Sequence, residues 1–262
     1  MFRGKVIWIT GASSGIGEAL SKALSKEHCN LILSARRENE LKRVKDECDN
    51  SGNIRVLPFD LANYQSMDEI VSKAISFFGK IDMLINNGGI SQRSLIIETA
   101  ISVDKKLMEI DYLGTVALSK ALLPHFIENK SGHFVTVTSL MGKFSSPYRS
   151  SYCGAKHALH GFFDALRLEH VQDNIKVTMI CPGFVNTNIS RNALIGDGTK
   201  LNKQDNATQN GLEPEIFVER MLKAIKKQKF EAYIGKGETK GIYLKRFFPK
   251  LLHRVILKSA VR

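Results

Sequence analysis

The chain alternates short apolar runs with longer amphipathic stretches from its first residues to about residue 234. Uninterrupted apolar runs predict buried strands, and spacings of three and four between apolar positions predict helices. The strands are expected at residues 6–10, 31–33, 54–59, 81–85, 134–138, 177–181 and, more briefly, 232–234. The helices are expected at residues 16–27, 38–49, 103–127, 150–170 and 213–227, with one more that ends near residue 78. This alternation predicts an α/β fold: a doubly wound, Rossmann-type parallel sheet flanked by helices, in a single domain.

Residues 186–211 are the one long polar interruption in this pattern. They include three glycines and many Asn, Thr and Lys residues, so we expect a loop or a mobile lid there. The total of 262 residues suits one large α/β domain. We therefore expect one domain over residues 1–240, which carries this segment, followed by a tail over residues 241–262.

A glycine-rich turn follows the first expected strand and opens the first expected helix. Residues 10–17 read Thr-Gly-Ala-Ser-Ser-Gly-Ile-Gly. Gly11, Gly15 and Gly17 let the backbone approach a pyrophosphate, and the helix N-terminus supplies N–H donors and a partial positive charge. The spacing differs from the commoner G-x-G-x-x-G. Its place after the first strand of an alternating chain nevertheless favours a dinucleotide site over an incidental tight turn.

Two arginines stand at the end of the second expected strand. An NAD site usually places an acid here to bind the ribose 2′-hydroxyl, whereas this chain has Ala35 followed by Arg36 and Arg37. A guanidinium suits the 2′-phosphate of NADP through charge and paired hydrogen bonds. The alternative is a pair of solvated charges, but cations are mildly unfavourable at the start of a helix. The pattern therefore predicts NADP(H) as the cofactor.

Polar residues also follow the third and fourth expected strands. Asp60 and Leu61 end one strand, and residues 86–89, Asn-Asn-Gly-Gly, end the other. Ligands bind at the carboxyl ends of strands in open α/β sheets. Either group by itself is equally compatible with an ordinary turn.

A serine, a tyrosine and a lysine form the candidate catalytic set. Tyr152 and Lys156 are four apart and share one face of a helix, and Ser139 ends the fifth expected strand. A neighbouring ammonium stabilises a phenolate, which makes a tyrosine usable as a general acid or base near neutral pH. A lone Tyr-x-x-x-Lys is more often a surface pair, so its meaning here depends on the glycine turn.

Taken together, these motifs resemble the short-chain dehydrogenase/reductase family over about residues 4–235. They are residues 10–17, residues 86–89, Ser139, the run 152–156 and Pro182 with Gly183. The amino-acid sequence of residues 147–158 is similar to that of the member-seven branch of the family. The resemblance implies an NADP(H)-dependent oxidoreductase that interconverts an alcohol and a ketone or aldehyde.

The resemblance also implies a role for each matching residue. Ser139 would bind the substrate oxygen, Tyr152 would pass the proton, and Lys156 would assist it and hold the nicotinamide ribose. The cofactor would contact Gly11, Ser13, Ser14, Gly15, Ile16, Gly17, Arg36, Arg37, Asp60, Leu61, Asn87, Gly88, Tyr152, Lys156, Pro182, Gly183, Val185 and Thr187. Asp111 stands where the family normally has an asparagine that holds a water of the proton relay. It adds a negative charge near Lys156, which leaves a catalytically weak NADP-binding sensor or scaffold as the alternative function.

The net charge of +12 is concentrated at the end of the chain. Residues 219–262 hold 13 Lys and Arg against 3 Glu, a net charge of +10. In the tail, cations alternate with bulky apolar residues, and on a helix after Pro249 the side chains of Leu252, Val255 and Ile256 share one face. Such a tail suits an anionic membrane surface, a substrate-loop helix or a contact in a homo-oligomer, and a substrate that is lipid-like fits the first of these. Nucleic acid is not an expected partner, because the chain has no nucleic-acid module and the basic patch is terminal.

The sequence gives no sign of a metal site, a membrane-spanning segment or a signal peptide. The four cysteines are scattered without zinc or redox spacing, so no metal site is expected. No apolar run approaches the ~20 residues that span a bilayer, and the N-terminus does not read as a signal peptide. A cytoplasmic location is expected, with peripheral membrane contact through the tail as an option.

Overall fold

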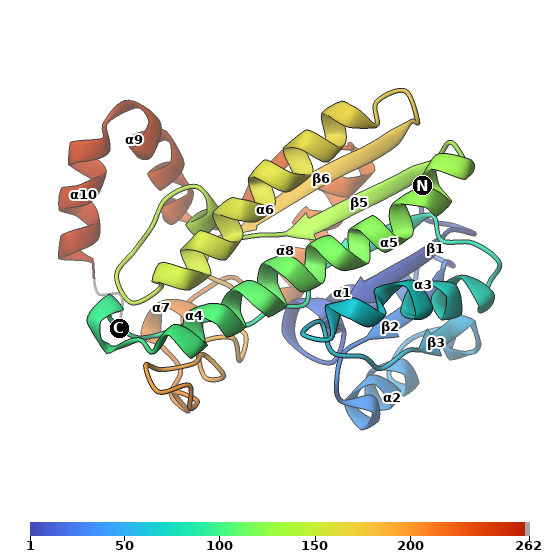
Figure 1. The fold of residues 1–262 in the computed structure, drawn as a ribbon, viewed down its shortest axis with the longest axis horizontal. Helices are drawn as coiled ribbons and strands as arrows, with labels where there is room; N and C mark the ends of the chain where they lie inside the picture. Colours follow the sequence, from blue (N-terminus) through green and yellow to red (C-terminus); the bar gives the residue numbers. More distant parts are fainter. Residues whose placement is uncertain (260–262) are drawn as a thin grey trace.

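A computed structural model describes residues 1–259 of the chain. Its centre is a parallel sheet of seven strands in the order β3-β2-β1-β4-β5-β6-β7 (Figure 1). The strands are β1 (Val6–Thr10), β2 (Asn30–Ser34), β3 (Ile54–Val56), β4 (Met83–Asn86), β5 (Gly132–Val137), β6 (Ile175–Pro182) and β7 (Glu231–Ile234). The predicted doubly wound fold is confirmed, because every neighbouring pair runs parallel.

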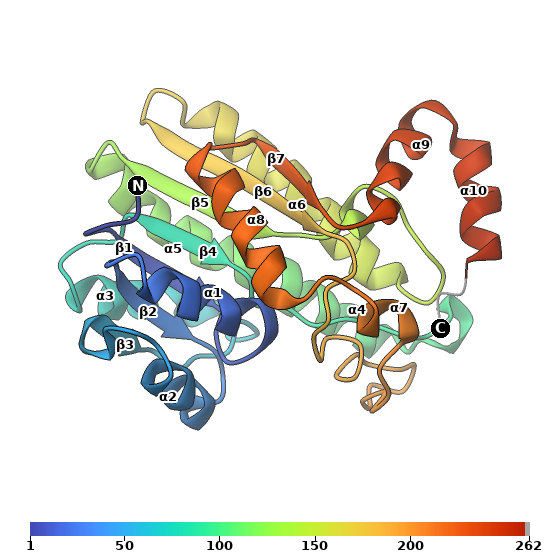
Figure 2. The ribbon, with the colours of Figure 1, turned by 180° about the vertical axis from the view of Figure 1, so that it is seen from behind.

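Helices cover both faces of the sheet (Figures 1 and 2). One face carries α1 (Gly15–Ser25), α2 (Glu38–Asp46) and α8 (Pro214–Lys226), and the other carries α3 (Met67–Ser76), α5 (Thr115–Glu128) and α6 (Ser150–Glu169). In β1, Ile7 and Ile9 pack in the first layer, whereas Val6 and Trp8 pack in the second. The strand is apolar at every position because both of its faces are buried.

Two elements differ from the expected ones. The expected helix over residues 103–127 is divided into α4 (Ile101–Leu107), a π-helical segment (Met108–Gly114) and α5. A Cβ on Gly114 would lie 2.3 Å from the carbonyl oxygen of Leu61, so only glycine allows this close approach. The third strand is shorter than expected and ends at Val56, although the backbone N–H groups of Leu57 and Phe59 still donate to the carbonyl oxygens of Leu33 and Ala35.

The connection from β3 to β4 places the site. β1 pairs with β2 on one side and with β4 on the other, so the strand order reverses beside β1. In open α/β sheets this reversal leaves a crevice outside the carboxyl ends of the strands, where ligands bind. Ser14, Asn86 and Ser139 all follow or end strands at this edge.

The segment over residues 186–211 is largely irregular and contains one short helix, α7 (Asn206–Gln209). It is held by isolated bridges between Gln92 and Leu194 and between Val185 and Leu212. Further short 3-10 helices lie at Ser51–Asn53, Tyr64–Ser66, Ile96–Glu98, Leu140–Gly142 and Gly237–Lys240.

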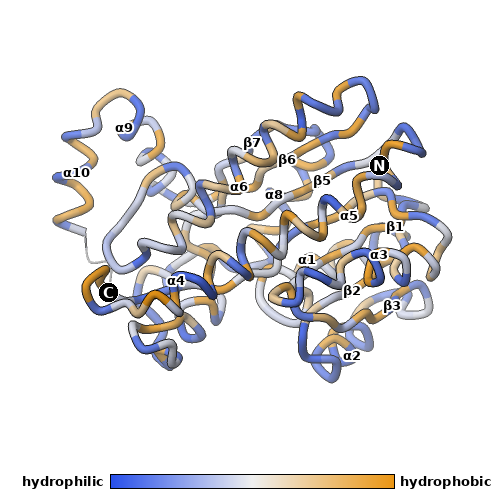
Figure 3. Tube along the Cα trace, in the orientation of Figure 1, coloured by the Kyte–Doolittle hydropathy of each residue, from blue (hydrophilic) through white to orange (hydrophobic). Residues whose placement is uncertain are grey.

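The tail forms two helices, α9 (Gly241–Phe247) and α10 (Pro249–Lys258), at one end of the molecule (Figure 1). The expected helix after Pro249 is confirmed. Hydrophilic and hydrophobic stretches are interleaved along both helices (Figure 3). The face that we expected a second subunit or lipid to cover is partly covered by the chain itself, because Leu252 and Ile256 pack with Leu140 and Phe144. None of the helices within residues 1–259 has the length and apolar character needed to cross a membrane.

Candidate active site

A cavity of about 820 Å³ runs along the carboxyl ends of the strands and continues toward α9 and α10. Every predicted site residue lines it except Gly17 and Asp111, which lie behind its wall. The lining residues are Gly11, Ser13, Ser14, Gly15, Ile16, Arg36, Arg37, Asp60, Leu61, Asn87, Gly88, Ser139, Tyr152, Lys156, Pro182, Gly183, Val185 and Thr187. The fold therefore gathers side chains from across the sequence into one space.

The glycine turn forms the floor of one half of this cavity. Gly11 has a φ of 64°, and a Cβ there would lie 2.7 Å from Gly88 Cα. A Cβ on Gly17 would lie 2.2 Å from the carbonyl oxygen of Gly11, which explains why this position needs glycine although it does not line the cavity. The turn thus presents bare backbone and the N-terminus of α1, which are the groups that bind a pyrophosphate.

Hydrogen bonds join the glycine turn to the end of β4. Thr10 Oγ1 accepts from the backbone N–H groups of Asn87, at 3.0 Å, and Gly88, at 2.9 Å. The side-chain amide of Asn87 donates to the carbonyl oxygens of Thr10, at 3.0 Å, and Gly11, at 3.3 Å. These bonds fix the spacing of the two strand ends that flank the crevice.

The two arginines lie beside the same half of the cavity. Arg37 Nη2 donates to Ser13 Oγ at 3.4 Å, and Arg36 Nη1 lies 4.0 Å from Asp60 Oδ2. The Arg36 side chain is 61% exposed, so its guanidinium is available to a ligand. The carboxylate of Asp60 also accepts from the backbone N–H of Ala62 at 3.0 Å, which holds the carboxylate in the turn after β3.

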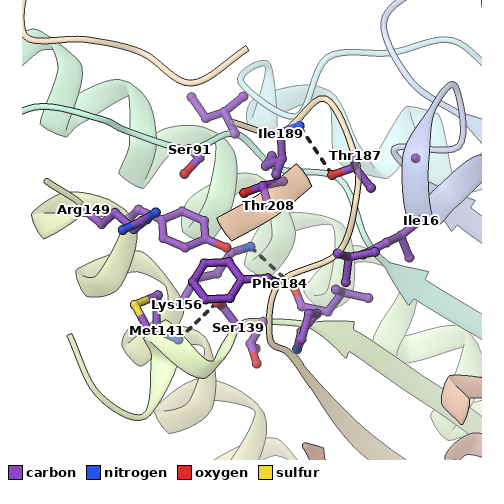
Figure 4. Close-up of a pocket in the computed structure, with 18 of the residues that line it drawn as sticks. Ile16, Ser91, Ser139, Met141, Arg149, Lys156, Phe184, Thr187, Ile189 and Thr208 are labelled. Atoms are coloured by element: carbon purple, nitrogen blue, oxygen red, sulfur yellow. Dashed lines mark hydrogen bonds between the residues drawn. The ribbon is translucent and has the colours of Figure 1, made fainter. Parts of the chain in front are cut away.

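Ser139, Tyr152 and Lys156 face the middle of the cavity. Figure 4 shows Ser139 and Lys156 next to Phe184 in the wall of the cavity. The backbone N–H of Met141 donates to Ser139 Oγ at 3.1 Å. Lys156 Nζ donates to the carbonyl oxygen of Val137 at 3.4 Å and lies 5.6 Å from the centre of the Tyr152 ring. The lysine is held by backbone and neighbouring charge, so its ammonium has a defined position beside the tyrosine.

Asp111 lies behind this set, fully buried in the π-helical segment. Its Oδ1 accepts from the backbone N–H of Ile90 at 2.8 Å, and its Oδ2 lies 3.4 Å from Lys156 Nζ without a hydrogen bond. Burial raises the pKa of the Asp111 carboxyl against the pull of Lys156. Burial also opposes the charge of Lys156, but the Asp111 and Tyr152 charges outweigh it and raise the lysine pKa. The charge that we expected near Lys156 is therefore in direct electrostatic contact with it.

Sequence reasoning missed a group of buried charges in the other half of the cavity. Arg93, Arg149 and Asp205 come from three separate segments and meet near Tyr152. Thr187, one of the expected cofactor contacts, lies over Gly15, whose Cβ would lie 3.0 Å from Thr187 Cγ2. Sequence reasoning missed Arg93 and Arg149 because they are far apart in the chain and belong to no common motif.

The tail, for which the sequence allowed three interpretations, also contributes to the cavity wall. Leu244, Leu252, Val255 and Ile256 line the cavity at the end opposite the glycine turn. The tail helices thus border the cavity, as the interpretation of the tail as a substrate-loop helix expects. Within residues 1–259, no three His, Cys, Asp or Glu side chains are grouped closely enough to hold a metal ion.

The fold and this arrangement of residues are those of a Rossmann-type oxidoreductase, and the comparisons with known proteins agree. The family described as short chain dehydrogenase matches residues 5–196. The chain therefore belongs to the short-chain dehydrogenase family, and the predicted resemblance is confirmed.

The similar curated proteins carry member-seven names. The chain is 40% identical to the dehydrogenase/reductase SDR family protein 7-like of Drosophila melanogaster, over 99% of this chain and 81% of that protein. It is 50% identical to the dehydrogenase/reductase SDR family member 7 of Homo sapiens, over 74% of this chain and 59% of that protein. Its identity to the member 7B protein of Mus musculus is 37%, over 98% and 82% of the two chains.

Solved structures share the fold. A short-chain dehydrogenase/reductase from Burkholderia phymatum in complex with NAD has a TM-score of 0.85 at 21% identity, over 95% of both chains. An alcohol dehydrogenase from the archaeon Thermococcus sibiricus, complexed with 5-hydroxy-NADP, has a TM-score of 0.76 at 23% identity, over 90% of this chain and 97% of that chain. This fold thus holds nicotinamide cofactors of both kinds, so the likeness leaves the choice between NAD and NADP to the residues themselves.

Proposed function

We propose that the protein is an NADP(H)-dependent oxidoreductase that interconverts an alcohol and a ketone or aldehyde. The observation that carries the proposal is the position of Ser139, Tyr152 and Lys156 in the middle of one cavity. One half of that cavity is shaped by glycines, and a Cβ on Gly11 would collide with the backbone of Gly88. The residues present therefore fit a dinucleotide, and the three polar side chains lie where its reactive end would meet a substrate.

Each residue of the set has a distinct task in this reaction. A bound nicotinamide cofactor supplies or accepts the hydride, which no side chain can do. Ser139 Oγ orients the substrate oxygen by a hydrogen bond, and the Tyr152 hydroxyl gives that oxygen a proton or removes one. The Lys156 ammonium, held by Val137 and Asp111, stabilises the phenolate that forms when Tyr152 has lost its proton.

The preference for NADP(H) rests on the cations beside β2. Arg36 and Arg37 border the cavity beyond Ala35, and the Arg36 guanidinium is exposed with only a long contact to Asp60. An extra phosphate on the ribose would form charge-assisted hydrogen bonds with such a pair. Asp60 is the carboxylate at this end of the cavity, and its oxygens are already engaged by Arg36 and Ala62.

One observation favours the second candidate, a cofactor-binding sensor or scaffold with little turnover. The Asp111 carboxylate has an oxygen without a hydrogen bond, buried against Lys156. A carboxylate there competes with the Tyr152 phenolate for the same ammonium. The complete set of Ser139, Tyr152 and Lys156 in one cavity outweighs this single feature.

Turnover of NADPH with a panel of aldehydes and ketones tests the two candidates. The purified protein should consume NADPH with at least some members of the panel, faster than it consumes NADH. If NADPH binds by titration but no carbonyl compound is reduced, and no alcohol is oxidised with NADP⁺, the sensor or scaffold is the better description.

The exposed side of the tail supports a further part of this proposal, a peripheral contact with anionic membranes by an otherwise cytoplasmic protein. Phe247 and Phe248 are 67% and 61% exposed, and Lys245, Arg246 and Lys250 lie beside them. Apolar side chains next to cations bind the surface of an anionic bilayer. A homo-oligomer that covers the same residues is the competing arrangement, and a lipid-like substrate would suit the membrane one.

A further inference from the structure

The substrate half of the cavity contains two arginines, Arg149 buried and Arg93 nearly so, that share one carboxylate. Arg149 precedes α6 by one residue and is 4% exposed. Its Nη1 donates to Ser146 Oγ at 3.0 Å, whereas its Nη2 lies 3.6 Å from Asp205 Oδ2 and makes no hydrogen bond. A buried guanidinium nitrogen without a hydrogen bond is rare, because leaving it unsatisfied costs free energy.

The shared carboxylate is already engaged by the other arginine. Asp205 Oδ2 accepts from Arg93 Nε at 3.1 Å and from Arg93 Nη2 at 2.9 Å, and its Oδ1 accepts from the backbone N–H of Thr208 at 2.7 Å. Two guanidinium groups thus face one carboxylate, and within residues 1–259 no second carboxylate pairs with them. Burial and the neighbouring Arg93 lower the pKa of Arg149 to about 10, so the group still carries its charge at neutral pH.

The placement of the three groups shows where a counter-charge can come from. Arg93 and Arg149 both line the cavity, whereas Asp205 does not. The carboxylates that line the cavity, Asp60 and Glu238, contact Arg36 and the backbone N–H of Phe184 respectively and not this pair. In Figure 4, Arg149 lies on the wall of the cavity that also holds Lys156 and Met141. The uncompensated charge therefore faces the space that a substrate occupies.

We propose that Arg149, supported by Arg93, is a binding subsite for a carboxylate group of the substrate. A carboxylate would accept hydrogen bonds from the guanidinium in the fork geometry that arginine favours. Phe144, Leu252 and Ile256 line the other side of the cavity and suit an apolar chain. The substrate class is accordingly an oxo acid or hydroxy acid with an apolar body, a proposal that rests on the oxidoreductase function above.

The test compares straight-chain oxo fatty acids of medium length with their methyl esters, with NADPH as reductant. The series varies the distance between the ketone and the carboxyl group. The wild type should reduce at least one acid with a kcat/KM about tenfold above that of its ester, which corresponds to about 1.4 kcal/mol. In Arg149→Met this ratio should fall to near one through a higher KM for the acid, while the kcat/KM of the ester stays within about twofold.

Lys200→Met is the matched control, because Lys200 also lines the cavity but is exposed at its mouth. It should retain the preference for the acid. If both variants lower the preference equally, the effect is general attraction by positive charge and the subsite is wrong. Equal losses for acid and ester in Arg149→Met would assign Arg149 a structural role instead. Should that variant fail to fold, Arg149→Lys replaces it and should keep a preference for the acid. A wild type that shows no preference for any acid over its ester would overturn the proposal directly.

A measurement without turnover separates the subsite from the proposed function. Decanoate, which cannot be reduced at a ketone, should bind to the wild type in the presence of NADP⁺, and Arg149→Met should weaken this binding about tenfold. If no carbonyl compound is turned over but decanoate binds in this way, the oxidoreductase function fails and the subsite remains. If carbonyl compounds are reduced but decanoate binds equally to both proteins, the subsite alone fails.

Discussion

The two halves of the cavity are built in different ways. The half below the glycine turn is formed by backbone and by short runs of residues that follow the strands, and Gly11 and Gly15 keep the turn itself free of side chains. The other half is formed by side chains from residues 90–93, from residues 139–152, from the segment at 182–208 and from the tail. A pyrophosphate needs only N–H groups and a helix N-terminus, whereas a particular substrate needs particular side chains.

The difference extends to buried charge. In the glycine half the cations, Arg36 and Arg37, are partly solvated beside the cavity. In the other half Arg93, Arg149 and Asp205 are buried together, where an unmatched charge is costly. A ligand in the glycine half meets cations that water already solvates. An anionic ligand in the other half would supply a counter-charge and so reduce the free-energy cost of the buried, unmatched arginine.

Tyr152 lies where the two halves meet, so its removal should separate them most clearly. Tyr152→Phe should lower turnover by about 10²–10⁴-fold, the range that general acid–base catalysis supplies. NADPH affinity should change little, because the ring remains and only the hydroxyl is lost. Steady-state kinetics and a fluorescence titration of NADPH measure the two quantities. Near-wild-type turnover in the variant would show that another group passes the proton.

The glycine turn should tolerate no side chain, although it forms no catalytic contact. Gly17→Ala places a Cβ where the carbonyl oxygen of Gly11 is 2.2 Å away, and such overpacking costs about 1–3 kcal/mol. Thermal unfolding should show a lower Tm, with weaker NADPH binding. Gly161→Ala in α6 is the control, since nothing lies within 4 Å of its Cβ, and it should stabilise the helix by up to about 1 kcal/mol. Equal Tm values for the two variants would contradict the close approach.

The cations beside β2 should decide between the two cofactors. Arg36→Ala should weaken NADPH binding by about 1.5 kcal/mol, the lower end for a charge-assisted hydrogen bond because the guanidinium is exposed. NADH binding should be unaffected. Lys42→Ala, an exposed cation on α2 that pairs with Glu38, should change neither affinity. If the wild type binds both cofactors equally in a titration, the interpretation of the arginines is wrong.

The charge behind the catalytic set should be visible in the pH profile. Asp111 raises the pKa of Lys156, so in the wild type the ammonium persists above its usual range. Asp111→Asn removes that support and leaves burial, which lowers the lysine pKa, opposed by Tyr152. If turnover depends on the ammonium, the alkaline loss of activity should begin at a lower pH in the variant than in the wild type. Near pH 10 the variant should be up to roughly tenfold less active than the wild type. The ratio of kcat at alkaline and neutral pH measures this, and identical profiles would show that the carboxylate is not coupled to the reaction.

The smallest expected effect concerns the exposed face of the tail. Replacing Phe247 and Phe248 together by serine should reduce binding to phosphatidylserine vesicles about threefold to tenfold at low salt, without changing the fold. Each nearby cation adds about 1 kcal/mol of attraction that salt screens. Leu168→Ser, an equally exposed apolar residue on α6, is the control and should bind as the wild type. If the wild type ignores such vesicles but the double variant changes the oligomer size, the tail is a subunit contact.

Much of the fold followed from sequence, because alternating apolar and amphipathic segments leave few arrangements. The glycine turn depends on contacts within a few residues, and parallel strands with helical crossovers have one preferred handedness. The order of the strands depends on pairings between distant residues, such as Ile7 with Met83. The division of the expected helix at residues 103–127 was not predicted. The π-helical segment ends at Gly114, which approaches Leu61 closely although the two residues are far apart in the chain.

For this protein the sequence by itself determined the class of fold, the glycine turn and the pairing of Tyr152 with Lys156, because each rests on residues joined by short spacings. Tertiary structure alone decided that Arg93, Arg149 and Asp205 meet, that Leu252 borders the cavity and that Asp111 contacts Lys156. These groups come from different loops and helices, and their charges and apolar faces acquire meaning only when the sheet and its crossovers bring them within a few ångströms of one another.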